Sequence, residues 1–441
     1  MNPHRALSIL LVHPSWRGLG NRKKVKVSER KIHPLTLGVI AAIIRRHDSR
    51  HRVRIVNQAH EAIPWDEPCD LVGITVNTYT APIAGEIAAR FRQRGVPVIM
   101  GGPHATLAPD ECLPCADAVV TGEAEEALPE LLDDFLAGKM KPLYHAPTIR
   151  NPGLIPAADR SLFNMPRGST AFVQATRGCG NACRFCYLGS VSWGPFRARP
   201  VRHVLDELAA MRERIILFVD DNMFTDRDYG LELFAGMRRL GKHWWAQAPT
   251  TLAANGELLQ AAADSGCFSL SYGFQTVKRA SIACDHITHN RVEDYVQVVR
   301  ESQKHGILVD GTFIFGFDGD DESVFDETAD MILRMNLDTY TIYYRTVYPG
   351  TPAFEQLRLK GRLLATDYAK YDWDHPVVQP LNMTAEQLER GMTRVYATLD
   401  HAYWGRFART MLGGARLLLR SPALAGFLLS AGLPRRYVVR Y

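Results

Sequence analysis

Apolar runs typical of buried strands alternate with segments of helical spacing along most of this chain, and this alternation limits the folds that it can adopt. The first series opens with the apolar run Ala6–Val12, and a second series runs from Thr170 to about Val347. Strand–helix alternation predicts parallel sheets with helices on their faces. A chain of 441 residues is too long for one hydrophobic core, so we expect several domains.

We predict a mixed α/β protein in four parts. Residues 1–140 are expected to form a doubly wound, Rossmann-like parallel sheet, and the Pro-containing stretch 141–167 a linker. Residues 168–365 are expected to form a partial TIM-like barrel of about six strand–helix units. Residues 366–441 are expected to be a largely helical C-terminal segment. In both kinds of sheet, ligands bind at the carboxyl ends of the strands.

Three cysteines occupy a loop directly after the expected strand 170–175. Cys179, Cys183 and Cys186 have the spacing Cys-x3-Cys-x2-Cys, and such thiolates can bind iron or zinc. Structural zinc takes four protein ligands, but the next histidine, His203, lies seventeen residues beyond Cys186. An iron–sulfur cluster held by three cysteines leaves one iron open to a substrate. The loop therefore predicts a catalytic [4Fe–4S] cluster.

This loop resembles that of the radical S-adenosylmethionine (SAM) superfamily, with Phe185 as the aromatic residue before the third cysteine. The resemblance continues through Asp220-Asp-Asn222, Gly273-Phe-Gln-Thr276 and Phe315-Gly-Phe-Asp-Gly319, and Tyr348-Pro-Gly-Thr351 closes the barrel as in relatives. Gln275 stands where glutamate is commoner, and an amide can still bond a ribose hydroxyl. The SAM-binding residues that the resemblance implies are Phe185, Tyr187, Asp220, Asp221, Asn222, Gly273, Gln275, Phe315 and Gly316.

Glycine-rich and polar loops follow the strands of the first series. Gly101-Gly-Pro-His-Ala-Thr106 and Thr121-Gly-Glu123 let a backbone approach a large ligand, and they resemble loops of the cobalamin-binding domain. The resemblance implies a cobalamin site at Thr75, Asn77, Thr78, Tyr79, Gly101, Gly102, His104, Thr106, Gly122 and Glu123. Because the Asp-x-His-x-x-Gly motif is absent, we expect His104 to line the nucleotide-tail pocket rather than to bind cobalt. Tyr79 is either the residue below cobalt or a packing aromatic.

Cysteines elsewhere raise a second hypothesis. Methylthiotransferases carry another cluster on three amino-terminal cysteines, and Cys69, Cys112 and Cys115 lie in this region. In those enzymes the first cysteine follows the first strand, where this chain has His13-Pro-Ser-Trp16, so we interpret these thiols as structural. Cys267 and Cys284 have no spacing partner and are interpreted in the same way.

Composition limits partners and compartment. A net charge of +5 without a clustered basic stripe gives no indication of nucleic-acid binding. Eight cysteines in a chain of this length are not a disulfide framework, no signal peptide opens the sequence, and no apolar run reaches the ~18 residues of a membrane span. We expect a cytoplasmic protein, as an oxygen-sensitive cluster requires.

The carboxyl-terminal segment leaves two interpretations open. The aromatic and acidic stretch 367–380 is expected either to wall a substrate pocket through Tyr371, Trp373 and His375 or simply to pack. Thr384 to Gln387 predicts a helix start. After Asp400 come seven arginines and no lysine or acid, with Arg406, Arg409, Arg416 and Arg420 on one helical face. Such a helix either contacts an anionic membrane surface at the inner face or docks on the barrel.

The resemblance is strongest to the cobalamin-dependent group that includes the hopanoid C-2 methylases, and it implies the chemistry. A reduced cluster cleaves SAM to a 5′-deoxyadenosyl radical, which takes hydrogen from an unactivated carbon. The substrate then receives a methyl group from methylcobalamin. We therefore predict a C-methyltransferase for a hydrophobic or secondary metabolite, supplied with electrons by flavodoxin or ferredoxin. The alternatives are a cyclase, oxidase or rearrangement enzyme with the same cofactors, and a cobalamin sensor without catalysis.

Overall fold

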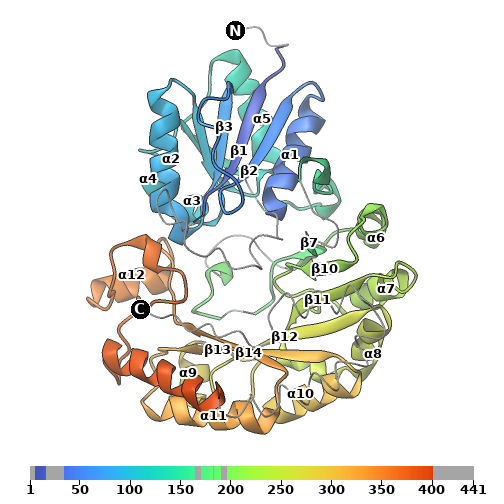
Figure 1. Cartoon of the computed structure of the whole chain (residues 1–441), viewed down its shortest axis with the longest axis vertical. Coiled ribbons are helices and arrows are strands. Elements are labelled where there is room, and N and C mark those ends of the chain that lie inside the picture. Colours follow the sequence, from blue (N-terminus) through green and yellow to red (C-terminus); the bar gives the residue numbers. More distant parts are fainter. Residues whose placement is uncertain are drawn as a thin grey trace.

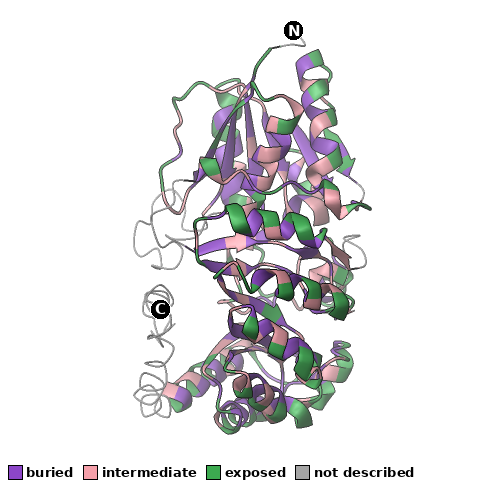
Figure 2. Cartoon of the chain, turned by 90° about the vertical axis from the view of Figure 1, so that its right-hand side faces the viewer, coloured by how far each residue is buried: buried purple, intermediate pink, exposed green. Residues whose placement is uncertain are grey.

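The computed structural model describes residues 5–15, 34–146, 148–163, 170–181, 183–189 and 196–400. Within them, two parallel sheets lie one above the other along the long axis of the molecule (Figure 1). The strands of both sheets are largely buried, and the helices expose their outer faces (Figure 2). This arrangement confirms the mixed α/β fold expected from the alternating pattern.

The amino-terminal sheet has six parallel strands in the order β2-β1-β3-β4-β5-β6. The order reverses direction at β1, as in a doubly wound fold. Its strands are β1 (Ser8–His13), β2 (Arg52–Asn57), β3 (Leu71–Thr75), β4 (Val98–Gly101), β5 (Ala118–Gly122) and β6 (Leu143–Ala146). Its helices are α1 (Leu35–His47), α2 (Ala81–Gln93), α3 (Pro103–Leu107), α4 (Pro109–Cys112) and α5 (Ala124–Ala137).

The second sheet also has six parallel strands, in the order β14-β13-β12-β11-β10-β7. These strands are β7 (Thr170–Val173), β10 (Ile215–Phe218), β11 (His243–Ala248), β12 (Cys267–Gln275), β13 (Leu308–Phe315) and β14 (Thr339–Tyr344). Six helices accompany them: α6 (Val201–Ala210), α7 (Arg227–Met237), α8 (Gly256–Asp264), α9 (Arg279–Cys284), α10 (Tyr295–Lys304) and α11 (Ser323–Met335). Because β7 and β14 are edge strands, the sheet is an open barrel.

Separate hydrophobic cores stabilise the two halves. One core lies on each face of the amino-terminal sheet, and a larger core fills the space between the barrel strands and their helices. A small core containing Val347, Phe354 and Tyr371 supports α12 (Pro352–Leu359) and the chain that follows it. Burial of this apolar surface is the main stabilising contribution to each half.

The structure departs from the sequence-based expectations in two elements. Strand β6 falls inside the stretch expected to be linker and pairs with β5 at the edge of the amino-terminal sheet. The short helix α9 was not anticipated. Thr384 and Gln387 form the expected reciprocal cap, and a helix covers residues 385–400. The arginine-rich stretch from Arg406 to Arg420 lies outside the described residues.

Candidate functional site

A cavity of about 400 Å³ lies where the strand ends of the two halves meet. Five residues expected to bind cobalamin line it from the amino-terminal sheet: Thr75, Gly101, Gly102, Gly122 and Glu123. From the barrel it is lined by Arg177 and Gly178, which lead into the cysteine loop, and by Tyr187, Leu188, Val219 and Asp221. The sequence thus places the glycine loops and the cysteine loop on the walls of one space.

The inner part of the cavity is apolar. Leu37 and Ile40 of α1, Leu128 and Leu132 of α5, and Ile9 of β1 form its walls between the helices and the sheet. A deep apolar slot with glycine turns at its mouth is suited to a large ligand that has both a flat ring and an extended tail. The residues present therefore fit a cobalamin.

Two glycine turns at the mouth of the cavity require the absence of a side chain. Gly102 has φ +103°, and a Cβ there would lie 3.1 Å from the amide nitrogen of Val76. Gly122 has φ +83°, and a Cβ would lie 2.1 Å from the carbonyl oxygen of Ala146. Thr106 braces both turns, since its hydroxyl donates to the carbonyl of Gly102 and accepts from the amide of Gly122. Thr106 is therefore a support of the site rather than part of the cavity wall.

The other residues expected at the cobalamin site do not line the cavity. Asn77 and Thr80 cap the short helix Thr78–Thr80, in which Thr78 is buried. Tyr79 packs edge-on against Trp373, with ring centroids 5.6 Å apart.

His104 does not line the cavity. It is 1% exposed, and its ring packs edge-on against Tyr368, with Nε2 at 3.5 Å from Glu111. Burial lowers the pKa of His104 to about 4, so the imidazole is neutral. Tyr368 comes from a distant carboxyl-terminal segment, and the local sequence pattern gives no signal of this cover.

Glu123 has a different set of partners from the one expected. Its carboxylate lies 3.3 Å from Arg177 and 2.7 Å from Arg197, and it accepts a hydrogen bond from the amide of Ile149. Arg177 also donates to Glu125, at 2.7 Å. These four charged side chains join the start of α5 to the strands that flank the cysteine loop, and the sequence analysis missed Arg177 and Arg197. Their position on either side of the motif was the available signal.

The cysteine loop is fixed by two adjacent carboxylates after β10. Asp220 is fully buried and accepts hydrogen bonds from the amides of Ala175 and Thr176 and from the Thr176 hydroxyl. Asp221 accepts from the amide of Gly178, at 3.1 Å, and also lines the cavity. Asp220 thus holds the backbone ahead of the cysteines instead of facing a ligand.

The thiols of the loop lie in a low-dielectric environment. Burial raises the pKa of Cys183 to about 12 and that of Cys186 to about 11. Coordinating iron reverses this preference, because a bound metal stabilises the thiolate. Among the residues that the structure describes, no three His, Cys, Asp or Glu side chains are grouped closely enough to hold a single metal ion. A four-iron cluster binds each cysteine at a different iron atom, so a wider spacing fits it.

Two buried oxygen atoms at the carboxyl ends of β10 and β12 have no hydrogen-bond partner among the residues that the structure describes. They are Oδ1 of Asn222 and Oε1 of Gln275. Gln275 has φ +65°, and its amide folds back across Gly273, where a Cβ would lie 2.3 Å from Nε2. An unpaired buried acceptor is costly, so these atoms fit a ligand with donor groups, such as the amino group and ribose hydroxyls of SAM.

The remaining residues expected at the SAM site are divided between the site and the core. Phe185 packs edge-on against Phe317, with centroids 5.6 Å apart, and Tyr187 packs against Tyr348 at 5.2 Å. Gly316 has φ +102° and its amide donates to Asp320. Phe315 is 1% exposed and packs on Phe325, so it is a core residue rather than a contact surface.

The three carboxyl-terminal residues expected near the substrate have different environments. Tyr371 is fully buried against Phe354 and Tyr368, so of the two interpretations left open it follows the one of ordinary packing. His375 lies against Asp372, with Nδ1 2.9 Å from its carboxylate. Trp373 is 38% exposed and its Nε1 donates to the hydroxyl of Tyr348, at 2.9 Å. Trp373 alone of the three joins the barrel end to the loop that carries Tyr79.

Comparisons with known proteins agree with this site. The family model of the radical SAM superfamily matches residues 173–332, and that of the B12 binding domain matches residues 23–132. A bacteriochlorophyllide d C-12(1)-methyltransferase from Chlorobaculum tepidum is 34% identical over 74% of this chain and 74% of its own length. A hopanoid C-2 methylase from Rhodopseudomonas palustris is 24% identical over 64% of this chain and 56% of its own.

Two further relatives have a different activity or only a similar fold. An anaerobic magnesium-protoporphyrin IX monomethyl ester cyclase from Cereibacter sphaeroides is 25% identical over 79% of this chain and 63% of its own. The solved structure of the methyltransferase TsrM from Kitasatospora setae, with tryptophan and a SAM analogue bound, has a TM-score of 0.68 and 15% identity, and covers 89% of both chains.

The fold and the shared cavity define an enzyme that uses an iron–sulfur cluster and SAM beside a corrinoid. The chain belongs to the cobalamin-binding branch of the radical SAM superfamily, and it is an enzyme of the methyltransferase type. Its cofactors are a [4Fe–4S] cluster, SAM and cobalamin.

Proposed function

We propose that this enzyme transfers a methyl group to an unactivated carbon of a hydrophobic ring compound of the tetrapyrrole kind. The shared cavity carries the proposal, because the glycine loops and the residues on both sides of the cysteine motif line the same space. The 34% identical relative, named for a methyl transfer to bacteriochlorophyllide d, supports the substrate class.

We assign the following roles to residues of this chain. Cys179, Cys183 and Cys186 hold the cluster, and Asn222 and Gln275 accept hydrogen bonds from SAM. Thr75, Gly102 and Gly122 let the corrin approach the amino-terminal sheet. When bound, the three cofactors supply radical formation and the methyl carrier, chemistry that no side chain can perform. The protein orients them and excludes water.

Anaerobic turnover with labelled SAM tests the proposal. The enzyme is reconstituted with iron, sulfide and hydroxocobalamin and given SAM with a deuterated methyl group, a one-electron reductant and bacteriochlorophyllide d as the probe. We expect 5′-deoxyadenosine together with a product that carries the deuterated methyl group. The variant with alanine at positions 179, 183 and 186 is expected to form neither. If neither the wild type nor this variant formed these products, and the variant still replaced the wild type in cells, a cobalamin sensor would replace the enzyme proposal.

The cyclase relative indicates a second possible outcome of the labelling experiment. Conversion of the probe without the labelled methyl group would favour cyclisation or oxidation with the same cofactors. If the probe is not converted while 5′-deoxyadenosine still forms, the tetrapyrrole class is wrong. Mass spectrometry of lipid extracts from cells with and without the gene then tests the hydrophobic substrates suggested by the hopanoid C-2 methylase relative.

We further propose that flavodoxin or ferredoxin reduces the cluster in the cytoplasm, with the arginine-rich carboxyl-terminal stretch touching the inner face of the membrane. Seven arginines after Asp400, with no lysine or acid, support an anionic surface as the partner. No described helix is both long and apolar enough to cross a bilayer. Flotation of the full chain with anionic vesicles, but not with neutral vesicles, is the expected result, and equal behaviour with both would reject the contact.

A further inference from the structure

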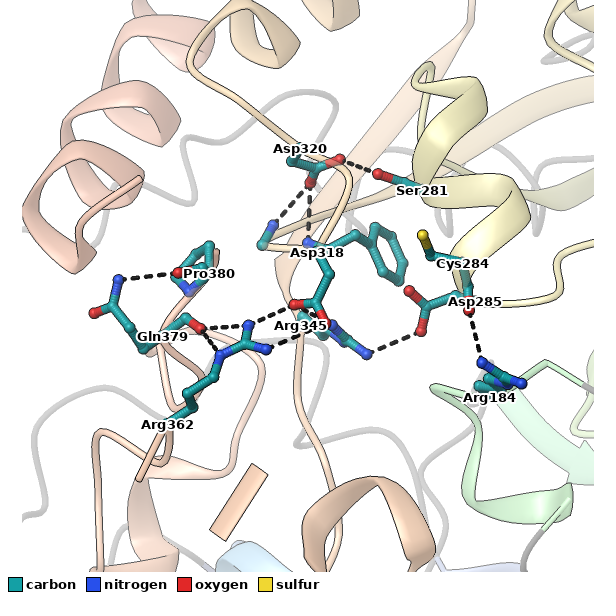
Figure 3. Close-up of polar contacts among 12 residues, drawn as sticks. Arg184, Ser281, Cys284, Asp285, Asp318, Asp320, Arg345, Arg362, Gln379 and Pro380 are labelled. Carbon is teal, nitrogen blue, oxygen red and sulfur yellow. Dashed lines mark hydrogen bonds and ion pairs between the residues drawn. The ribbon is translucent and has the colours of Figure 1, made fainter. Parts of the chain in front are cut away.

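A group of charged side chains joins the ends of β13 and β14 to the cysteine loop (Figure 3). Arg345, which follows β14, is 8% exposed, and its Nη2 donates to Oδ1 of Asp285 at 2.9 Å. Its Nη1 lies 3.2 Å from Oδ1 of Asp318, which in turn is bound by Arg362. Arg345 and Asp285 therefore form a buried ion pair inside the barrel.

Asp285 connects this pair directly to the cluster-binding motif. It lies at the end of α9, and its carbonyl oxygen accepts a hydrogen bond from the amide of Arg184 at 2.9 Å. Arg184 stands between Cys183 and Phe185 in the motif. One residue thus holds Arg345 with its carboxylate and the middle of the cysteine loop with its backbone.

The same pair also touches the segment Phe315–Gly319, which the resemblance implies to be part of the SAM site. The amide of Arg345 donates to the carbonyl of Phe315 at 2.8 Å, and its guanidinium lies over the ring of Phe317, 5.5 Å from the centroid. Phe317 packs edge-on against Phe185 of the cysteine loop. Arg345 therefore supports the contact between the cysteine loop and the Phe315–Phe317 segment, and both segments have to bind the same SAM molecule.

Helix α9 also contacts the segment Gly316–Gly319. Asp320 accepts hydrogen bonds from the amides of Gly316 and Phe317 and from the hydroxyl of Ser281 in α9 (Figure 3). A Cβ at Gly319 would lie 2.5 Å from the amide nitrogen of Ser281, so the two backbones are in direct contact. The short helix that sequence analysis missed thus supports both the cysteine loop and the Gly316–Phe317 segment.

We propose that Arg345 and Asp285 are positioning residues that set the cysteine loop at a fixed separation from the Gly316–Phe317 segment, so that SAM can reach both. The proposal rests on the cluster and SAM sites of the proposed function. A buried ion pair costs desolvation and is weak evidence of stability, and its directional hydrogen bonds are better suited to fixing geometry. Neither side chain needs to touch SAM or the cluster for this role.

The test removes the pair without leaving a lone buried charge. The double variant Arg345→Met/Asp285→Leu keeps similar side-chain volume. Replacing Arg345 alone would leave the Asp285 carboxylate buried without this partner and endanger folding, whereas Asp285→Leu alone would leave Arg345 paired with Asp318. The reconstituted, reduced protein is titrated with SAM, and the change in the paramagnetic spectrum of the cluster is followed. We expect normal iron and sulfide contents but a requirement for about tenfold more SAM, or loss of the spectral change, since small displacements of reacting groups are costly.

A matched control removes another ion pair from the same part of the barrel. Lys278, just before α9, pairs with Glu327 of α11 and with Asp321. Lys278→Met/Glu327→Leu is expected to require the same SAM concentration as the wild type. Arg345→Lys is expected to require a concentration between those of the wild type and the Arg345/Asp285 variant, because a lysine keeps the charge but not the planar guanidinium. Failure of the Arg345/Asp285 variant to load the cluster would contradict the proposal, because the pair would then be needed to form the cysteine loop itself.

Two results would overturn it. A wild-type SAM titration in the double variant would show that the pair does not set the geometry, and equal weakening in the control would show a general loss of barrel stability. A wild-type protein that binds no cluster, or shows no spectral change with SAM, would instead refute the proposed function.

Discussion

Trp373 has a strained backbone conformation and contacts both the amino-terminal half and the barrel. It has φ +67°, a backbone conformation that costs a residue other than glycine about 1–3 kcal/mol and persists only where the surroundings impose it. Its backbone carbonyl accepts from the amide of Tyr344, its indole donates to Tyr348, and its ring meets Tyr79. These contacts hold a half-exposed indole between the amino-terminal half, which carries Tyr79, and the barrel.

Replacement of Trp373 by glycine separates its role in stability from its role in the reaction. Trp373→Gly relieves the left-handed conformation, which offsets the lost ring contacts, so we expect a melting temperature close to that of the wild type. If the indole orients the substrate, 5′-deoxyadenosine should accumulate with much less methylated bacteriochlorophyllide d. Asn336→Gly, which relieves a φ of +56° at the end of α11, is the control and should leave that ratio unchanged. An unaltered ratio in Trp373→Gly would make the indole a packing residue only.

Asp220 should give the protein a measurable pH dependence. Burial raises its pKa from 3.8 to about 7 in the folded state, so between these values the folded protein binds more protons than the unfolded chain. Stability is therefore lost as the pH rises from about 4 towards 7, and above 7 the buried charge opposes folding. Asp220→Asn accepts the same hydrogen bonds without titrating, so urea unfolding should show it gaining stability over the wild type at pH 8 but not at pH 5. An equal difference at both values would contradict this.

At the scale of elements, the sequence predicts those strands and helices whose formation is determined by a local pattern of residues. The apolar run Ala6–Val12 and the expected strand 170–175 are observed as β1 and β7, because apolar runs of this length determine buried strands. β6 was missed because it is only four residues long, alternates exposed and buried positions, and follows a Pro-containing stretch. α9 is short and has no apolar face of its own, so its existence depends on the loop that packs against it.

The same distinction applies to the site. The cysteine spacing and the glycine turns are local patterns, and residues that flank the cysteines line the same cavity as the glycine turns. His104 was expected at a ligand surface, but Tyr368, which is distant in sequence, covers it. Phe315 and Tyr371 are buried against aromatic residues nearer in the chain, and no pattern within their own motifs reports that burial. The arginine–carboxylate contacts around the cysteine loop were missed for the same reason, since each joins elements far apart in the chain.

The turn between β5 and α5 can be tested with a pair of alanine variants. Gly122 and Gly95 both have positive φ, but only at Gly122 would a Cβ meet backbone, since nothing lies within 4 Å of the Cβ position at Gly95. Gly95→Ala should cost about 1 kcal/mol from the left-handed conformation alone. Gly122→Ala should cost more and reduce the cobalamin retained after gel filtration, measured by absorbance. Equal cobalamin retention in the two variants would show that the turn tolerates displacement.

At the scale of the whole molecule, the two halves meet through buried charges as well as through the cavity. Glu123 and Glu125, at the start of α5, face Arg177 and Arg197, which flank the cysteine loop. Each carboxylate is 6% exposed, so water screens these pairs little. The contact links the turn at Gly122 to the strand that leads into Cys179, and it should make the two cofactor sites move as one unit.

Arg177→Met tests that link. Removing the cation leaves Glu125 buried without this partner, and breaking such a pair costs about 3–5 kcal/mol. We expect a lower melting temperature and faster hydrogen exchange both at the start of α5 and in the strand before Cys179, because both depend on the same guanidinium. Arg54→Met removes exposed pairs with Glu61 and Glu67 and should cost no more than about 1 kcal/mol. Faster exchange confined to the barrel side in Arg177→Met would show that the halves are held together by the cavity walls and not by these charges.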